Sequence, residues 1–64
     1  MTWELYEVWS VDEDGHEDLV DTTRSLKEAQ EIAGATLQEE HIVEVIVYQE
    51  DENGDLKELS RITN

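Results

Sequence analysis

The chain contains no cysteine, and only four of its 64 residues are lysine or arginine. Without cysteine, no disulfide can cross-link the fold and no thiolate can bind zinc. The longest apolar run, residues 45–48, is far too short for a helix that crosses a bilayer. The three glycines stand apart, so no glycine-rich phosphate loop is present. These absences exclude disulfide scaffolds, thiolate zinc sites and phosphate-loop nucleotide binding.

Acidic residues dominate the composition. Eighteen aspartates and glutamates give a formal net charge of −14 at pH 7. Such a surface disfavours direct binding to nucleic acid or to an anionic membrane, because both carry negative charge themselves. It favours a basic protein partner, a cation-rich milieu or mimicry of nucleic acid.

The length of the chain predicts a single domain spanning residues 1–64. A folded chain of this size buries roughly 60% of its extended surface, so a core must supply the stability. Apolar residues make up 38% of the sequence, which is enough for a modest core. The first residues show no basic segment followed by an apolar run, so no signal peptide is expected. A cytoplasmic location is therefore the expectation.

Four segments have the composition of strands, and two turn signals join them in pairs. Asp14-Gly15 and Asn53-Gly54 are hairpin turn signals, because both positions of each pair accept positive φ at low cost. The segments around them are rich in aromatic and β-branched residues. The predicted strands are residues 3–11, 17–23, 41–49 and 55–62.

One helix is predicted between the two hairpins, over residues 26–40. Ser25 and Glu28 have the spacing of a capping box, in which the serine hydroxyl accepts a hydrogen bond from a backbone N–H of the first turn. Apolar side chains, among them Ala29 and Ala33, then fall on one arc of the helical wheel.

The pattern predicts an α+β fold of ββαββ type with one helix packed on one face of a four-stranded antiparallel sheet. The second and fourth strands carry the most charge, as edge strands do in natural sheets. The first and third strands are apolar on both faces, which is typical of central strands. The strand order 2-1-3-4 satisfies both observations and makes every neighbouring pair antiparallel.

The sequence resembles two groups of known proteins. The segment 23–29, with Ala33 and residues 45–59, resembles several uncharacterised families of small ββαββ domains. That resemblance implies a fold and no activity. The composition is similar to that of small acidic proteins of halophilic archaea. It implies a haloadapted domain whose acids serve hydration and have no separate binding role.

The histidines and acidic turns are the only candidates for a metal site. The predicted topology places the first hairpin turn and the end of the helix together, which would gather His16 and His41 near Asp12 and Asp14. Imidazoles with carboxylates could hold zinc or nickel. His41 near a helix C-terminus also complements the helix dipole with no metal at all. The acidic turns lack the glycine and glutamate positions of a calcium-binding loop. We therefore expect no metal and no cofactor.

No catalytic constellation can be recognised in the sequence. The serines Ser10, Ser25 and Ser60 have no evident histidine and aspartate partners. A pocket of several hundred Å³ is also hard to fit into a chain of this length. The sequence therefore predicts a protein that is not an enzyme.

Apolar residues on both faces of the central strands predict an interface, because one helix covers only one face of a sheet. The predicted patch comprises Tyr6, Val8, Ile46 and Tyr48, or the tryptophans if the faces are reversed. An exposed apolar patch of several hundred Å² marks an interaction site. We therefore expect a non-enzymatic interaction module that pairs through its uncovered sheet face, either as a homodimer or with a basic protein.

An alternative function is mimicry of DNA. Acidic clusters at residues 12–14 and 50–55 are expected at opposite ends of the molecule. A protein of this kind would inhibit a basic nucleic-acid-binding protein by occupying its groove, which requires carboxylates in rows spaced like phosphates.

Overall fold

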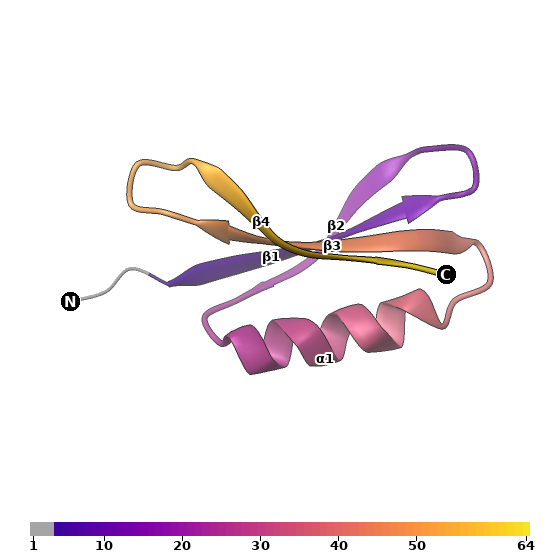
Figure 1. The fold of residues 1–64 in the computed structure, drawn as a ribbon, viewed down its shortest axis with the longest axis horizontal. Coiled ribbons are helices and arrows are strands. Elements are labelled where there is room, and N and C mark those ends of the chain that lie inside the picture. The colour runs from indigo at the N-terminus through magenta and orange to yellow at the C-terminus, as the bar shows by residue number, and fades with distance from the viewer. Residues whose placement is uncertain (1–3) are drawn as a thin grey trace.

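A computed structural model describes residues 4–64 of the chain (Figure 1). The sheet has the strand order β2-β1-β3-β4, and all neighbouring strands are antiparallel. The α+β class, the ββαββ arrangement and the strand order predicted from the sequence are therefore confirmed. The start of the first predicted strand, at residue 3, lies outside the described residues. The elements are β1 (Leu5–Asp12), β2 (Glu17–Thr23), α1 (Leu26–Leu37), β3 (Ile42–Glu50) and β4 (Leu56–Thr63).

The helix α1 begins where the sequence places its cap. The Ser25 hydroxyl accepts a hydrogen bond of 3.2 Å from the backbone N–H of Glu28. The helix ends at Leu37, short of the predicted end, because the N–H of Gln38 bonds to the carbonyl of Ala35 and tightens the last turn. Within residues 4–64, no helix has the length and apolar character needed to cross a membrane.

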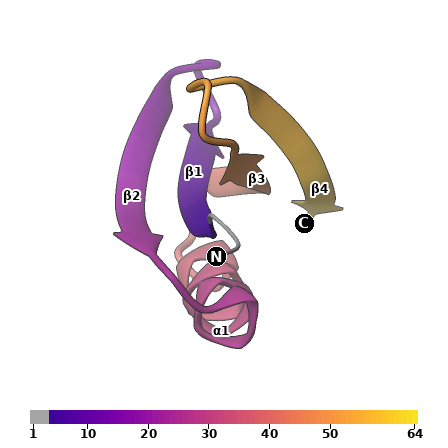
Figure 2. The ribbon, with the colours of Figure 1, turned by 90° about the vertical axis from the view of Figure 1, so that its left-hand side faces the viewer.

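The core lies between α1 and one face of the sheet (Figures 1 and 2). Two alanines of the helix, Ala29 and Ala33, are completely buried against the sheet, because their small side chains let the helix backbone approach β1 and β3. Ile32 and Leu37 pack against the same cluster from the flanks of the helix. The buried cluster consists of Tyr6, Val8, Ala29, Ala33, Ile42, Val45 and Val47.

The register of β1 against β3 decides which side chains share a face. Val8 lies opposite Val47, and Trp9 lies opposite Ile46. Successive side chains of a strand point to opposite faces. Val8 and Val47 therefore point toward α1, whereas Trp9 and Ile46 point to the other side. A shift of one residue would exchange the two sets.

The two hairpin turns have the same geometry. The carboxylate of Asp12 accepts hydrogen bonds from the backbone N–H groups two and four residues further on, both at 2.9 Å. Asp51 does the same at 2.8 and 3.0 Å. Gly15 and Gly54 then adopt φ values of 85° and 86°, a region that side chains disfavour. The two turns are thus confirmed at the predicted positions, but only the glycines adopt positive φ, whereas Asp14 and Asn53 do not.

The sheet bends away from the helix at both hairpins. The pairing of β1 with β2 shifts between Val8 and Trp9, and that of β3 with β4 shifts between Val47 and Tyr48. Such bulges bend a strand and increase its twist. The hairpin tips consequently rise on the side away from α1, at opposite ends of the sheet (Figure 1). β2 and β4 arch on either side of β1 and β3 (Figure 2).

Candidate functional site: the helix-free face of the sheet

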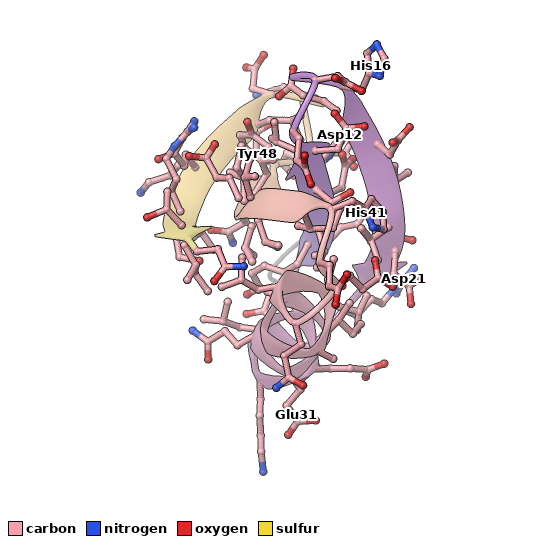
Figure 3. All side chains as sticks on the ribbon, turned by 90° about the vertical axis from the view of Figure 1, so that its right-hand side faces the viewer. Asp12, His16, Asp21, Glu31, His41 and Tyr48 are labelled. Carbon is pink, nitrogen blue, oxygen red and sulfur yellow. The ribbon has the colours of Figure 1, made fainter. Side chains whose placement is uncertain are left out.

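The strand register defines the face that α1 does not cover, which we call the helix-free face. It combines aromatic and aliphatic side chains at its centre with carboxylates around them. Figure 3 shows Tyr48 on this side of the sheet, away from the helix. The side chains that alternate onto this face are Leu5, Glu7, Trp9, Val11, Glu17, Leu19, Thr22, Glu44, Ile46, Tyr48, Glu50, Leu56, Glu58, Arg61 and Thr63.

The centre of the helix-free face is packed. Ile46 is only 1% exposed although no helix lies over it. Trp9 on β1 lies directly opposite Ile46 and is half-buried, as is Tyr48 further along β3. Leu19 and Leu56 on the edge strands remain 49% and 47% exposed. The face therefore has a small core of its own, flanked by uncovered leucines.

An open pocket of about 250 Å³ lies on this face. Its lining residues are Trp9, Glu17, Tyr48 and Leu56, so each of the four strands contributes one side chain. The indole N–H of Trp9 donates a hydrogen bond of 2.9 Å to a carboxylate oxygen of Glu7. This bond fixes the tryptophan that forms one wall. The pocket is smaller than the roughly 300–1,000 Å³ sites that hold drug-sized ligands.

Carboxylates outnumber basic groups on the helix-free face, and among residues 4–64 Arg61 is the only basic residue that the register assigns to it. Its guanidinium lies between the carboxylates of Glu44 and Glu58, at 2.7 Å from the latter. The hydrogen bond to Glu58 is the main reason why the pKa of Arg61 is raised. The same hydrogen bond lowers the pKa of the Glu58 carboxyl. Arg61 is thus engaged by Glu44 and Glu58, and within residues 4–64 it forms no ion pair with Glu17 of the pocket.

The predicted interface patch is wrong as a group of four. Ile46 and Tyr48 lie on the helix-free face, but Tyr6 and Val8 are 7% and 0% exposed beneath α1. The reason is the register, which places Tyr6 and Val8 of β1 on the same sheet face as Val45 and Val47 of β3. Trp9 occupies their place, and Trp3, the other tryptophan of the reversed-face alternative, lies outside the described residues.

Two of the four residues that line the pocket, Glu17 and Leu56, were not predicted from the sequence, and Trp9 was predicted only in the reversed-face alternative. A signal for the open face was nevertheless available. Glu7 alternates with Tyr6 and Val8, so it belongs to the same side of its strand as Trp9. Glu44 is related in the same way to Ile46. A glutamate is rarely buried under a helix without a partner. These two residues therefore indicate which side of each strand remains open.

The two histidines do not form one site. His41 lies next to the first hairpin turn as predicted, and its carbonyl accepts a backbone hydrogen bond of 3.1 Å from that turn. However, the ring of His16 is 3.6 Å from Asp12, whereas the ring of His41 is 3.9 Å from Glu39 (Figure 3). Among residues 4–64, the donor atoms close enough to share an ion belong to Asp12, Asp14 and His16. The two hydrogen bonds that Asp12 accepts in closing the hairpin account for this grouping.

The Asp12 carboxylate gives the stability of the fold a specific dependence on pH. Its pKa is lowered from 3.8, chiefly by the hydrogen bond from the backbone N–H of His16. Ionised Asp12 therefore favours the folded state above pH 3.8, and this contribution is lost as the pH falls through the lower folded value. We expect wild type to lose more stability than Asp12→Asn between about pH 5 and about pH 2.

Chemical denaturation followed by circular dichroism measures this difference. The experiment is done in about 1 M salt, because screening with a Debye length of about 3 Å suppresses the general repulsion among carboxylates. Asparagine keeps an oxygen that accepts the turn hydrogen bonds and removes only the titration. If the free energy of unfolding fell equally with pH in wild type and in Asp12→Asn, Asp12 would not be the source of the pH dependence.

No protein-family model matches the chain, and no curated protein or solved structure gives a significant match. The resemblance to small ββαββ families, the halophilic composition and the cytoplasmic location stay predictions. Function must be inferred from the geometry and charge of the helix-free face.

Proposed function

We propose that this protein is a non-enzymatic interaction module whose helix-free face docks a basic partner protein. The observation that carries the proposal is the pocket lined by Trp9, Glu17, Tyr48 and Leu56, set in an apolar centre with glutamates around it. Tryptophan and tyrosine are enriched among the residues that dominate binding energy at interfaces. Among the described residues, the lining has no nucleophile beside a base, so binding is favoured over catalysis.

Charge favours a basic partner over a second copy of the chain, the other partner that the sequence predicts. Two helix-free faces brought together would oppose the excess carboxylates of both, and like charges across an interface cost affinity. The net charge of −14 would act in the same direction over longer distances. A basic partner is instead attracted and accelerated in its approach.

Mimicry of DNA is the second candidate. Its supporting observation is that the two acidic hairpin tips lie at opposite ends of the sheet (Figure 1). We favour docking because the surface between the tips has an apolar centre of Trp9, Ile46 and Tyr48, whereas mimicry needs continuous rows of carboxylates.

Titration with a short peptide of alternating leucine and arginine tests the proposal at about 0.15 M salt, where charges beyond about 8 Å are screened. We expect Leu56→Lys to weaken binding by about tenfold or more, because it places a cation in the pocket. The matched control is Leu26→Lys, which makes the same charge change at a similarly exposed leucine on α1. That variant should bind like wild type.

Nuclear magnetic resonance and light scattering identify the surface and the oligomeric state. Shifts of the Trp9 indole and of alternate residues of all four strands, with a monomeric protein, support the proposal. Shifts confined to the hairpin tips would contradict it in favour of charge mimicry. A stable dimer that hides the same residues would contradict it in favour of self-association. Equal weakening by Leu56→Lys and Leu26→Lys would show that net charge alone attracts the peptide.

A further inference from the structure

The pocket on the helix-free face has the chemistry of a cation site. Two of its four lining side chains are aromatic, one is a carboxylate and one is aliphatic. A cation within about 6 Å of an aromatic ring is attracted by its electron-rich face, most strongly by tryptophan. Resting on the function proposed above, we infer that this pocket receives an arginine side chain of the partner, between Trp9 and Tyr48 and opposite Glu17.

Glu17 is the charged member of this pocket. It stands at the start of β2, is exposed to solvent and lies opposite Val11 across the β1–β2 ladder. Within residues 4–64, no ion pair occupies its carboxylate. Arg61, the one basic residue that the described part of the chain places on the helix-free face, is held by Glu44 and Glu58. Glu17 can therefore serve as the counter-ion of a cation that comes from outside.

Trp9 presents its ring and not its polar atom. The indole N–H already donates to Glu7 at 2.9 Å, so it is not available to a hydrogen-bond acceptor on a ligand. The remaining ring surface suits an apolar or cationic group. An anionic group is disfavoured by the surrounding glutamates. A purely apolar side chain would desolvate Glu17 without a partner, which is costly.

The helix-free face already holds one guanidinium between carboxylates. Arg61 is hydrogen-bonded to Glu44 and Glu58, and Tyr48 lies opposite Glu58 in the β3–β4 register. Tyr48 also lines the pocket, so the same side chain borders both places. The planar guanidinium stacks on aromatic rings and pairs with a carboxylate through two donors, whereas the lysine ammonium is a compact and strongly hydrated charge. These properties select arginine over lysine.

Substitution of a single arginine in the test peptide examines this inference by calorimetry. Citrulline has nearly the shape of arginine without its charge. We expect the replacement of the central arginine by citrulline to weaken binding to wild type by about tenfold, and the replacement by lysine to weaken it less. Glu17→Gln should weaken the arginine peptide by a similar factor and largely remove the difference between arginine and citrulline. That loss of discrimination measures the coupling between Glu17 and the guanidinium.

The matched control is Glu31→Gln, which removes the same charge from the outer side of α1 (Figure 3). It should change the affinity by less than about threefold and keep the preference for arginine. Tyr48→Phe should also keep that preference because the ring remains, whereas Tyr48→Leu should reduce it. Circular dichroism confirms that each variant is folded.

The outcomes separate this inference from the function on which it rests. If Glu17→Gln and Glu31→Gln weaken binding equally while Leu56→Lys still weakens it far more than Leu26→Lys, the docking face stands and the arginine site is overturned. If the lysine peptide binds as tightly as the arginine peptide, the preference for arginine is overturned. If neither Leu56→Lys nor Glu17→Gln differs from its control, both proposals are overturned.

Discussion

Replacing Ile46 with alanine lowers the free energy of unfolding by about 2–5 kcal/mol, the range for loss of a buried aliphatic side chain. Ile46 lies on the helix-free face, yet only 1% of its surface is exposed. Its neighbours across the sheet are Trp9 on β1 and Arg61 on β4. A chain of this length has a total stability of about 3–10 kcal/mol, so the substitution removes a large fraction of it.

Ile62→Ala is the matched control for this experiment. It removes the same atoms from an isoleucine that is 38% exposed on the edge strand β4. We expect a cost of about 1 kcal/mol, which is typical of single substitutions. Urea denaturation at fixed salt, followed by circular dichroism, gives both values. Equal losses for the two variants would contradict a packed centre on the helix-free face.

The result also bears on how this face binds. The residues that dominate an interface are most effective when packing holds them in place before the partner arrives. Ile46 lies beside Trp9 in the register, and Tyr48 follows two positions along the same side of β3. A large effect of Ile46→Ala would mean that the packing which stabilises the fold also positions the aromatic walls of the pocket.

Raising the salt concentration from about 0.01 M to about 1 M increases the melting temperature by at least about 4 °C. The radius of gyration is 11.6 Å, so at about 0.01 M the Debye length of about 30 Å lets the carboxylates repel one another across the molecule. At about 1 M it is about 3 Å and the repulsion is local. Relief of only about 1 kcal/mol raises the melting temperature of a domain of this size by about 4–8 °C. The ion pairs of Arg61, which salt weakens, are exposed and contribute less than this.

A charge-reduced variant separates screening from other effects of salt. Glu31→Gln, Glu40→Gln and Glu52→Gln together remove exposed carboxylates that form no ion pair within residues 4–64. We expect this variant to melt higher than wild type in dilute salt and to approach it at about 1 M. Melting curves followed by circular dichroism measure both. A flat response of wild type would contradict substantial charge repulsion and with it the haloadapted interpretation.

Stability and binding respond to salt in opposite directions. Screening relieves repulsion within the folded chain, but it also weakens the attraction of a basic partner. The same carboxylates therefore cost stability in the free protein and promote association. Binding of a basic partner should stabilise this chain most in dilute salt, where its own repulsion is greatest.

The local elements of this fold could be predicted because each is determined by neighbours in the sequence. Ser25 caps α1 through a hydrogen bond to the backbone of Glu28, as its spacing predicts. Gly15 and Gly54 supply the positive φ values that the turn signals require. The strand order also followed from the sequence, since charge marks the edge strands and apolar residues mark the central ones.

The candidate site could not be predicted in the same way, because it depends on contacts between distant strands. Alternation assigns the residues of β1 and of β3 to two sides of each strand, but it does not determine which side of β1 shares a sheet face with which side of β3. Tyr6 and Val8 were therefore grouped with the wrong side of β3. The pocket depends on more than register, because the pairing shifts beside Trp9 and Tyr48 help to bend the edge strands around the face.

The sequence by itself determined the ββαββ order, the two turns, the helix cap and the acidic surface, because each arises from local conformational preference or from composition. Only the tertiary structure decided which apolar side chains are covered by α1 and which line the pocket. The physical reason is the pairing of Val8 with Val47 and of Trp9 with Ile46. That register buries the uncharged sides of both central strands against the helix and leaves the sides bearing Glu7 and Glu44 to the solvent and to a partner.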